Sequence, residues 1–531
     1  MKGANWVPAH ILPEHSGDER VVDLLLQSAH DAHMTMLRVW GGGLYESDYF
    51  YQRCDELGIL VWQDFLFSCA MYPTDPEFLE SVSLEVQQNV IRLQHHPSLA
   101  IWAGNNEIEL ALRGNWFPSS RDFETNFRDY VKLFVDTIKP IVKELDPGRR
   151  YLVSSPSNGL EAETKREFIS DNPGDSHFGD THHYVHYMAD NWDASSYFYT
   201  RFASEYGFQS LPSIETMSKA IDDEDELNIY SEYSQHRQHS PNRYTFIEKQ
   251  IDLHLGEYDK TFHSNDYEKY IFYSQIVQAM ALKTATEFYR QSRAYWNTMG
   301  ALYWQLNDVW QAPSASSIEY GGKWKMVHYF AKRFFAPILV SARLLPDGDI
   351  DIYVINDKIS PIVDAEIIVD VFNWTSLTPI SSNMYKVSDI EPLSSTKQDI
   401  KIVLWDKLRN TEIFIRFSLR KKGVALSPFN FVFPAPFKSV IKLRFQTYKY
   451  FLQVTVQPRL RQQENKFHYK VFIQVDTVIL FLWLEAENQD GKFQDNGLII
   501  TEPFTYVNFV SNKILKPLQL QKSIKWRYYH K

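Results

Sequence analysis

Apolar residues follow two alternating patterns along the first 337 positions of the chain. Short apolar runs, typical of strands buried on both faces, alternate with longer stretches in which apolar residues recur at three- and four-residue spacing, typical of helices. Because a strand, a helix and a second strand in succession place the two strands parallel, this alternation predicts a parallel sheet covered by helices.

The short runs predict eight strands and the longer stretches predict the helices between them. The predicted strands are 2–6, 35–39, 58–63, 99–103, 150–154, 179–184, 201–205 and 300–305. The main predicted helices are 21–33, 47–57, 76–95, 123–145, 267–295 and 324–335. Eight strands that alternate with helices predict a (β/α)8 TIM barrel over residues 1–337.

From residue 338 the pattern changes to short alternating strands separated by turn residues, as in Pro346-Asp-Gly-Asp349. The strands predicted there are 349–355, 365–373, 400–405, 412–418, 448–456 and 468–475, and the apolar run 478–484 is predicted to be a core strand. Such spacing is typical of antiparallel sandwiches. We therefore predict two immunoglobulin-like β-sandwiches, one over residues 338–434 and one over residues 435–531.

The composition narrows the classes of function. A net charge of −11 without a basic stripe argues against a nucleic-acid partner and against an anionic membrane surface. No apolar run reaches the roughly 20 residues of a membrane-spanning helix. The two cysteines, Cys54 and Cys69, do not make a disulfide scaffold. Aromatic residues make up 15% of the chain and include 14 tryptophans, which favours a binding site with flat apolar platforms such as a sugar site.

The amino terminus carries no targeting pattern. Met1 is followed directly by the first predicted strand, without the charged and apolar regions of a secretory signal. We therefore expect no signal peptide in the chain as printed, and a truncated first barrel strand. Farther along, Asn373-Trp-Thr375 matches the acceptor pattern for N-glycosylation.

Two glutamates stand where predicted strands end. Glu107 follows the run Ile-Trp-Ala-Gly-Asn-Asn, and Glu205 ends the segment Arg-Phe-Ala-Ser-Glu. The carboxyl ends of the strands form the active site of a TIM barrel, so both carboxylates are expected at one mouth. Two such carboxyls are what hydrolysis of a glycosidic bond requires, with retention or inversion decided by their separation. The alternative for a single glutamate is a helix cap or an ion pair with an arginine, such as one between Arg38 and Glu205.

Other polar and aromatic residues fall at the same strand ends or in the loops that follow. They are candidates for binding a sugar through hydroxyl hydrogen bonds or ring stacking. The candidates are Asn5, Trp6, Arg38, Trp40, Asp64, Asn106, His182, His183, Tyr184, Trp192, Trp304 and Trp324.

A metal or a cofactor is not expected. The neighbouring histidines His182 and His183 suggest a metal at first, but no HExxH pattern or cysteine spacing completes a ligand set. Glycine-rich nucleotide motifs and a nucleophile elbow are also missing from any fitting context.

Several of these segments together resemble the β-mannosidases of glycoside hydrolase family 2, and most of all the animal lysosomal enzymes. The resemblance covers residues 2 to about 340 and returns in Phe493-Gln-Asp-Asn-Gly497. The segments are Lys-Gly-Ala-Asn-Trp-Val-Pro, Leu-Arg-Val-Trp-Gly-Gly-Gly, Val-Trp-Gln-Asp-Phe, Trp-Ala-Gly-Asn-Asn-Glu, Phe-Ala-Ser-Glu-Tyr-Gly and Leu-Tyr-Trp-Gln-Leu-Asn-Asp-Val-Trp-Gln-Ala-Pro.

The resemblance implies a retaining exo-enzyme that removes a terminal β-linked mannose from N-glycan-derived oligosaccharides in the lysosome. It implies that Glu107 is the acid/base and Glu205 the nucleophile, and that Asp64 recognises hydroxyls far from the scissile bond. The family's amino-terminal domains are not in this chain. The alternatives are therefore a truncated, catalytically impaired form that only binds carbohydrate or a partner, and a related β-glycosidase of other sugar specificity.

Overall fold

The computed structural model describes residues 1–116, 119–165, 169–185, 189–256, 264–402, 409–440, 452–457, 461–463 and 466–530. The chain forms two compact units. The first comprises Met1–Ile247 and Thr261–Ala336, and the second comprises Glu248–Lys260 and Pro337–Lys531.

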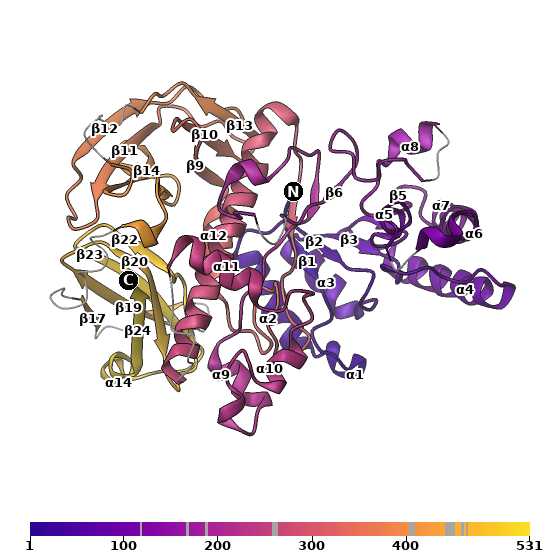
Figure 1. The fold of residues 1–531 in the computed structure, drawn as a ribbon, viewed down its shortest axis with the longest axis horizontal. Coiled ribbons are helices and arrows are strands. Elements are labelled where there is room, and N and C mark those ends of the chain that lie inside the picture. The colour runs from indigo at the N-terminus through magenta and orange to yellow at the C-terminus, as the bar shows by residue number, and fades with distance from the viewer. Residues whose placement is uncertain are drawn as a thin grey trace. The chain divides into compact units, whose positions relative to one another are not determined.

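The first unit is built on an eight-stranded parallel sheet that curls as in a TIM barrel (Figure 1). Its strands are β1 (Lys2–Trp6), β2 (Met36–Val39), β3 (Leu60–Asp64), β4 (Leu99–Ala103), β5 (Arg150–Leu152), β6 (Thr181–His182), β7 (Ala203–Glu205) and β8 (Ala301–Tyr303). The strand order is β5-β4-β3-β2-β1-β8-β7-β6. The prediction of eight parallel barrel strands is confirmed, and β1 pairs with both β2 and β8.

The two strands at the ends of this order, β5 and β6, are linked beyond their ends through a buried aspartate. Asp180 precedes β6 and accepts a hydrogen bond from the backbone N–H of Ser157 at 3.0 Å, while its own N–H donates to the carbonyl of Ser157 at 3.3 Å. The curl of the sheet is therefore closed by Asp180 together with the residues that follow β5.

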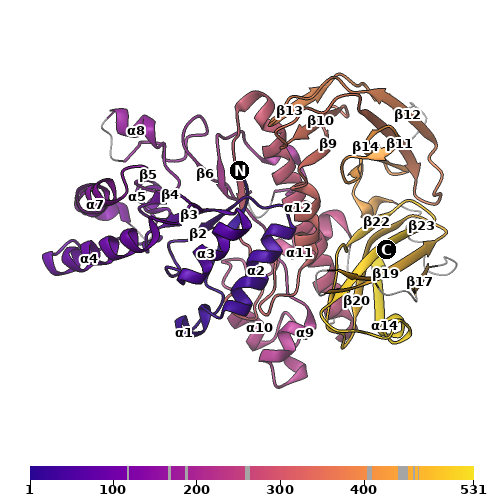
Figure 2. The ribbon, with the colours of Figure 1, turned by 180° about the vertical axis from the view of Figure 1, so that it is seen from behind.

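Helices follow most of the strands (Figure 2). They are α1 (Pro13–Ser16), α2 (Glu19–Asp31), α3 (Asp48–Leu57), α4 (Pro76–Leu93), α5 (Ile108–Gly114), α6 (Phe123–Tyr130), α7 (Lys139–Leu145), α8 (Leu160–Lys165), α9 (Ile214–Met217), α10 (Glu232–Arg237), α11 (Thr245–His254), α12 (Ser264–Trp296) and α13 (Met326–Phe334). A π-helical segment, Val131–Ile138, joins α6 to α7. The six main predicted helices are confirmed, with ends within a few residues of the predicted ones.

Local sequence signals explain where several of these helices begin and end. At the start of α4, Asp75 accepts a hydrogen bond from the N–H of Phe78 at 3.0 Å, and Pro76 occupies the first helical position, where a missing N–H costs nothing. At the end of α3, Gly58 adopts φ 68°, the left-handed conformation that glycine adopts without steric cost.

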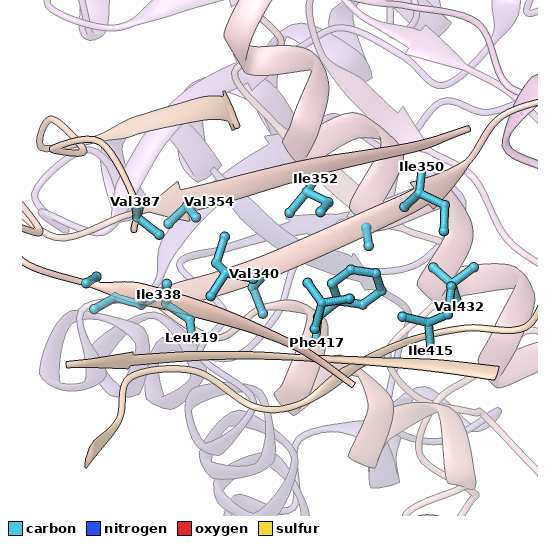
Figure 3. Packing of buried hydrophobic residues seen from close by; sticks show 14 of the residues in the cluster. Ile338, Val340, Ile350, Ile352, Val354, Val387, Ile415, Phe417, Leu419 and Val432 are labelled. Carbon is cyan, nitrogen blue, oxygen red and sulfur yellow. The ribbon is translucent and has the colours of Figure 1, made fainter. Parts of the chain in front are cut away.

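The second unit contains antiparallel sheets around two hydrophobic cores. The first core lies between the sheet β13-β10-β9 and the sheet β12-β11-β14-β15, with β16 beside β14 (Figure 3). These strands are β9 (Ile338–Leu344), β10 (Ile350–Asn356), β11 (Glu366–Asn373), β12 (Ser381–Lys386), β13 (Ser394–Gln398), β14 (Ile413–Lys421), β15 (Val424–Ala425) and β16 (Asn430–Val432). Alternation along β10 directs Ile350, Ile352 and Val354 into this core.

The second core lies between the sheet β17-β19-β23-β21, with β18 beside β19, and the sheet β22-β20-β24. These strands are β17 (Leu452–Val456), β18 (Arg461–Gln463), β19 (Lys466–Val475), β20 (Ile479–Ala486), β21 (Lys492–Phe493), β22 (Leu498–Ile500), β23 (Phe504–Ser511) and β24 (Ile524–Tyr529), and α14 (Pro517–Ser523) precedes β24. The apolar run at 478–484 is a core strand, as predicted.

Two strand predictions in this unit need comment. The predicted strand 400–405 is wrong over 400–402, which have no strand pairing, and 403–405 lie outside the described residues. The predicted strand 448–456 is confirmed only from Leu452, since 448–451 also lie outside them. The division into sandwiches 338–434 and 435–531 stays a prediction. Among the described helices, none combines the length and the apolar character needed to cross a membrane.

The first core of the second unit provides a test of packing. Phe417 is completely buried in it, so Phe417→Ala should lower the free energy of unfolding of this unit by about 3–5 kcal/mol through lost burial and a cavity. Urea titration followed by tryptophan fluorescence, to which Trp374 buried in the same unit contributes, measures the change.

Met384→Ala is the control, because Met384 is 65% exposed on β12 of the same sandwich. The packing argument fails if both variants shift the urea midpoint equally.

Candidate active site

Glu107 lies at the junction between β4 and α5. Its backbone adopts a left-handed conformation (φ 62°), and its N–H donates to the carbonyl of Ser155 at 2.8 Å. The side-chain oxygen of Asn105 accepts from the N–H of Ile108 at 3.1 Å and so caps the start of α5. A non-glycine residue with positive φ costs free energy, and here two neighbouring strand ends hold it in place.

Glu205 is the last residue of β7 and its side chain is 5% exposed. Arg38 Nη1 donates to Oε1 at 2.5 Å, and the Tyr184 hydroxyl donates to Oε2 at 2.9 Å. Both oxygens of this carboxylate therefore accept hydrogen bonds from groups fixed on other strand ends.

Arg38 is the centre of the polar network. It is completely buried on β2 and, besides Glu205, donates to Asp64 at 2.7 and 3.3 Å, to Asn5 at 2.9 Å and to Asn106 at 2.8 Å. Burial opposes its charge, but Asp64 and Glu205 raise its pKa above the ordinary value. The guanidinium is thus a permanent cation beside Glu205.

The two glutamates face each other across His182 of β6. One carboxylate oxygen of each glutamate and one ring nitrogen of His182 all lie within 4.8 Å of one another. His182 Nδ1 is 2.7 Å from Glu107 Oε1 and 3.5 Å from Glu205 Oε2. Two carboxylate oxygens this close fit a retaining glycosidase, whose carboxyl groups are about 5–5.5 Å apart, better than an inverting one, whose carboxyl groups are about 6.5–9.5 Å apart.

Glu107 and His182 perturb each other. Burial raises the pKa of Glu107, but the hydrogen bond and charge of His182, together with Cys69 and Arg38, leave that pKa below its ordinary value. Burial in turn lowers the pKa of His182, but Glu205 and Glu107 outweigh it and leave the imidazole pKa raised. A contact of 2.7 Å between Nδ1 and Oε1 holds one proton, which the pair shares.

Two residues near the carboxylates were not among the candidates that the sequence analysis named for the site. Cys69 Sγ is 3.4 Å from Glu107 Oε2 and 3.3 Å from Asn106 Nδ2. Ser155 Oγ is 3.2 Å from His182 Nε2. Cys69 lies between predicted elements and Ser155 just past one, and neither position carries a sequence motif.

The candidate tryptophans separate into two groups. Trp40 and Trp304, which follow β2 and β8, have ring centroids 5.1 Å apart in an edge-to-face arrangement, and both are partly exposed. Trp6 instead donates to Glu46 and packs on Phe50 of α3, with centroids 4.7 Å apart.

The remaining aromatic candidates have their own partners. Trp324 is 5% exposed and donates to Ser28 of α2. Trp192 donates to the carbonyl of Val277 of α12. His183 lies 3.2 Å from the carbonyl of Ser196, and its ring contacts Phe198. The predicted sugar contacts of these residues stay predictions. Trp6 and Trp324 contact residues of neighbouring helices or loops instead of the two glutamates.

The candidates around Arg38 also divide. Tyr184 donates to Glu205, and Asn106 precedes Glu107 in the chain; their predicted contacts with a sugar stay predictions. Asn5 and Asp64 are completely buried behind Arg38, and Asp64 also accepts from Trp62 at 3.0 Å and from the N–H of Gly41 at 3.1 Å. Their predicted contact with a sugar stays a prediction, and in the structure they position Arg38.

Comparison with known proteins gives relatives along almost the whole chain, although no family model matches it. The β-mannosidases of Capra hircus and Bos taurus are each 39% identical over 98% of the chain, and the chain spans 59% of their length. The crystal structure of the β-D-mannosidase from Dictyoglomus thermophilum is similar at 30% identity, with a TM-score of 0.83 over 100% of this chain and 60% of that one.

The chain is homologous to the β-mannosidases. An exo-chitosanase from Amycolatopsis orientalis shares the fold, with a TM-score of 0.72 at 14% identity over 99% of this chain and 62% of that one. The β-mannosidases therefore match this chain far better in sequence than the exo-chitosanase does. This agrees with the resemblance carried by the strand-end segments.

Removal of Arg38 tests the role of the network in stability. Arg38→Met leaves Asp64 and Glu205 buried without their cation, so the free energy of unfolding of the first unit should fall by about 3–5 kcal/mol. Thermal and urea unfolding at neutral pH measure the loss.

Arg20→Met is the matched control, because Arg20 pairs with Asp18 on the surface and its side chain is 91% exposed. It should leave the midpoint nearly unchanged. Equal effects of the two substitutions would contradict the stabilising role of Arg38.

Proposed function

We propose that this protein is a retaining exo-β-mannosidase that hydrolyses terminal, non-reducing β-D-mannose from N-glycan-derived oligosaccharides. The observation that carries the proposal is the approach of Glu107 and Glu205, with carboxylate oxygens within 4.8 Å, at the mouth of a barrel homologous to those of the β-mannosidases.

Glu205 acts as the nucleophile. Arg38 and Tyr184 donate to its two oxygens, so the orientation of the carboxylate is fixed before a substrate arrives. Desolvation of its hydroxyl, together with the neighbouring glutamates, raises the pKa of Tyr184, which therefore remains a neutral donor. Glu205 attacks the anomeric carbon and forms a glycosyl ester as the bond to the leaving oxygen breaks.

Glu107 acts as the acid and then as the base. It delivers to the leaving oxygen the proton that it shares with His182, and in the second step it takes a proton from the water that cleaves the ester. Two displacements at the anomeric carbon give net retention, and Glu205 leaves the second step as a free carboxylate.

The mannose ring is bound by groups on the same side of the barrel. We assign Asn106 and Tyr184 to hydroxyls next to the reacting carbon, and the edge-to-face pair Trp40 and Trp304 to the apolar face of the ring. Arg38, with Asn5 and Asp64 behind it, holds this arrangement in place. A lysosomal setting is part of the proposal and is supported by the resemblance to the animal enzymes.

Kinetics of carboxamide variants test the assignment. Glu205→Gln should lower kcat/KM on p-nitrophenyl β-mannoside on the order of 10⁴-fold or more, because no ester forms. Glu107→Gln should lower it about 10²–10⁴-fold, and less on a dinitrophenyl mannoside, whose leaving group needs no proton. Proton NMR of the wild-type reaction should show the β-anomer of mannose first.

Three results would reject the proposal. They are turnover of the galactoside or glucuronide but not of the mannoside, first release of the α-anomer, and sugar binding without turnover that Glu205→Gln leaves unchanged. The last outcome identifies a carbohydrate-binding protein. Thermal unfolding of both variants should match the wild type closely enough to exclude misfolding.

A further inference from the structure

A serine hydroxyl lies between a buried carboxylate and the far side of His182. Ser155 Oγ is 2.7 Å from Asp180 Oδ2 and 3.2 Å from His182 Nε2. Ser155 is completely buried, Asp180 is 3% exposed and the side chain of His182 is 1% exposed. The three groups continue directly into the contact between His182 Nδ1 and Glu107 Oε1.

The partners of Asp180 fix the direction of the first hydrogen bond. Its carboxylate receives the N–H of Ser157 at 3.0 Å and the hydroxyls of Ser155 and Ser204 at 2.7 and 2.6 Å. Ser155 donates its only hydroxyl hydrogen to Asp180 Oδ2. Its oxygen is then left with lone pairs, and it accepts from His182 Nε2.

The tautomer of His182 follows. Nε2 carries a hydrogen, so the neutral ring presents Nδ1 to Glu107 as an acceptor. The 2.7 Å contact then exists only with a second proton in place, either on Glu107 Oε1 or on His182 Nδ1. With the opposite tautomer, the ring would donate Nδ1–H to an ionised Glu107, and the acid would hold no proton for a leaving group.

We propose that Ser155 and Asp180 are positioning residues that hold His182 in the Nε2–H form, so that the pair of His182 and Glu107 carries one transferable proton. This inference rests on the proposed function of Glu107. It assigns a catalytic consequence to the link that closes the barrel between β5 and β6, since the same Asp180 makes both sets of contacts.

Four other charged or titratable groups face the pair of His182 and Glu107, and their effect on the pH dependence is the same in the wild type and in the Ser155 variant. Arg38 disfavours and Glu205 favours a charged imidazole, Cys69 contacts the second oxygen of Glu107, and Tyr184 donates to Glu205. None of these groups is altered by a change at Ser155.

The test is the pH profile of kcat/KM for Ser155→Ala. Without its acceptor the Nε2–H is unsatisfied, the ring favours the opposite tautomer, and the extra proton is bound less tightly. The basic limb of the profile on a substrate with a poor leaving group should move to lower pH by about one unit, the size expected for one lost hydrogen bond to a charged group. On a dinitrophenyl mannoside, kcat/KM at neutral pH should change less than about threefold, because its leaving group needs no proton.

Ser154→Ala is the matched control. Ser154 is an equally buried serine one residue earlier, and its hydroxyl donates to Asn105 at 2.7 Å, not to the histidine. It should leave the basic limb in place even if it lowers the unfolding temperature. Asp180→Asn should move the limb in the same direction as Ser155→Ala, because an amide can turn its donor toward the serine oxygen.

An unchanged basic limb in Ser155→Ala, or equal shifts in Ser155→Ala and Ser154→Ala, would overturn the inference while the wild type still cleaves mannoside. A wild type that cleaves no mannoside would instead reject the proposed function. Thermal unfolding of each variant separates loss of folded protein from loss of proton affinity.

Discussion

The site depends on one buried cation. Arg38 donates to Asn5, Asp64, Asn106 and Glu205 from the centre of the barrel, where water does not reach it. Two carboxylates at that depth are stable only next to a positive charge, and a planar guanidinium reaches several strand ends at once, as a lysine does not. Glu205, the Asn106 amide beside Glu107, and the first and third strands therefore depend on the same side chain.

Much of the barrel, and the meeting of Glu107 and Glu205, follows from the sequence. Glu107, Glu205 and Arg38 fall at the ends of apolar runs, and parallel strands bring such ends together wherever the strands stand in the order. The roles of the two glutamates came from the resemblance of the strand-end segments to the β-mannosidases. That assignment remains a proposal.

The sequence did not predict the direction of side chains at and beyond the strand ends, and this direction decides which candidates reach the site. Alternation places Asn5 toward Arg38 and its neighbour Trp6 toward α3, but a strand end alone does not show where alternation stops. Trp324 is held by Ser28, almost 300 residues away, a contact that no local pattern encodes. The link from Asp180 to Ser155 exists only because β5 and β6 meet when the sheet curls.

The thiol beside Glu107 has a chemical consequence of its own. Burial, and to a lesser extent Glu107, raise the pKa of Cys69 to about 11. At pH 7 the thiolate fraction is then about 10⁻⁴, from the difference between 11 and 7, and only the thiolate is a good nucleophile. The Cys69 sulfur, 3.4 Å from the Glu107 carboxyl, therefore reacts slowly with alkylating agents and oxidants, and it contacts Glu107 without adding a negative charge beside it.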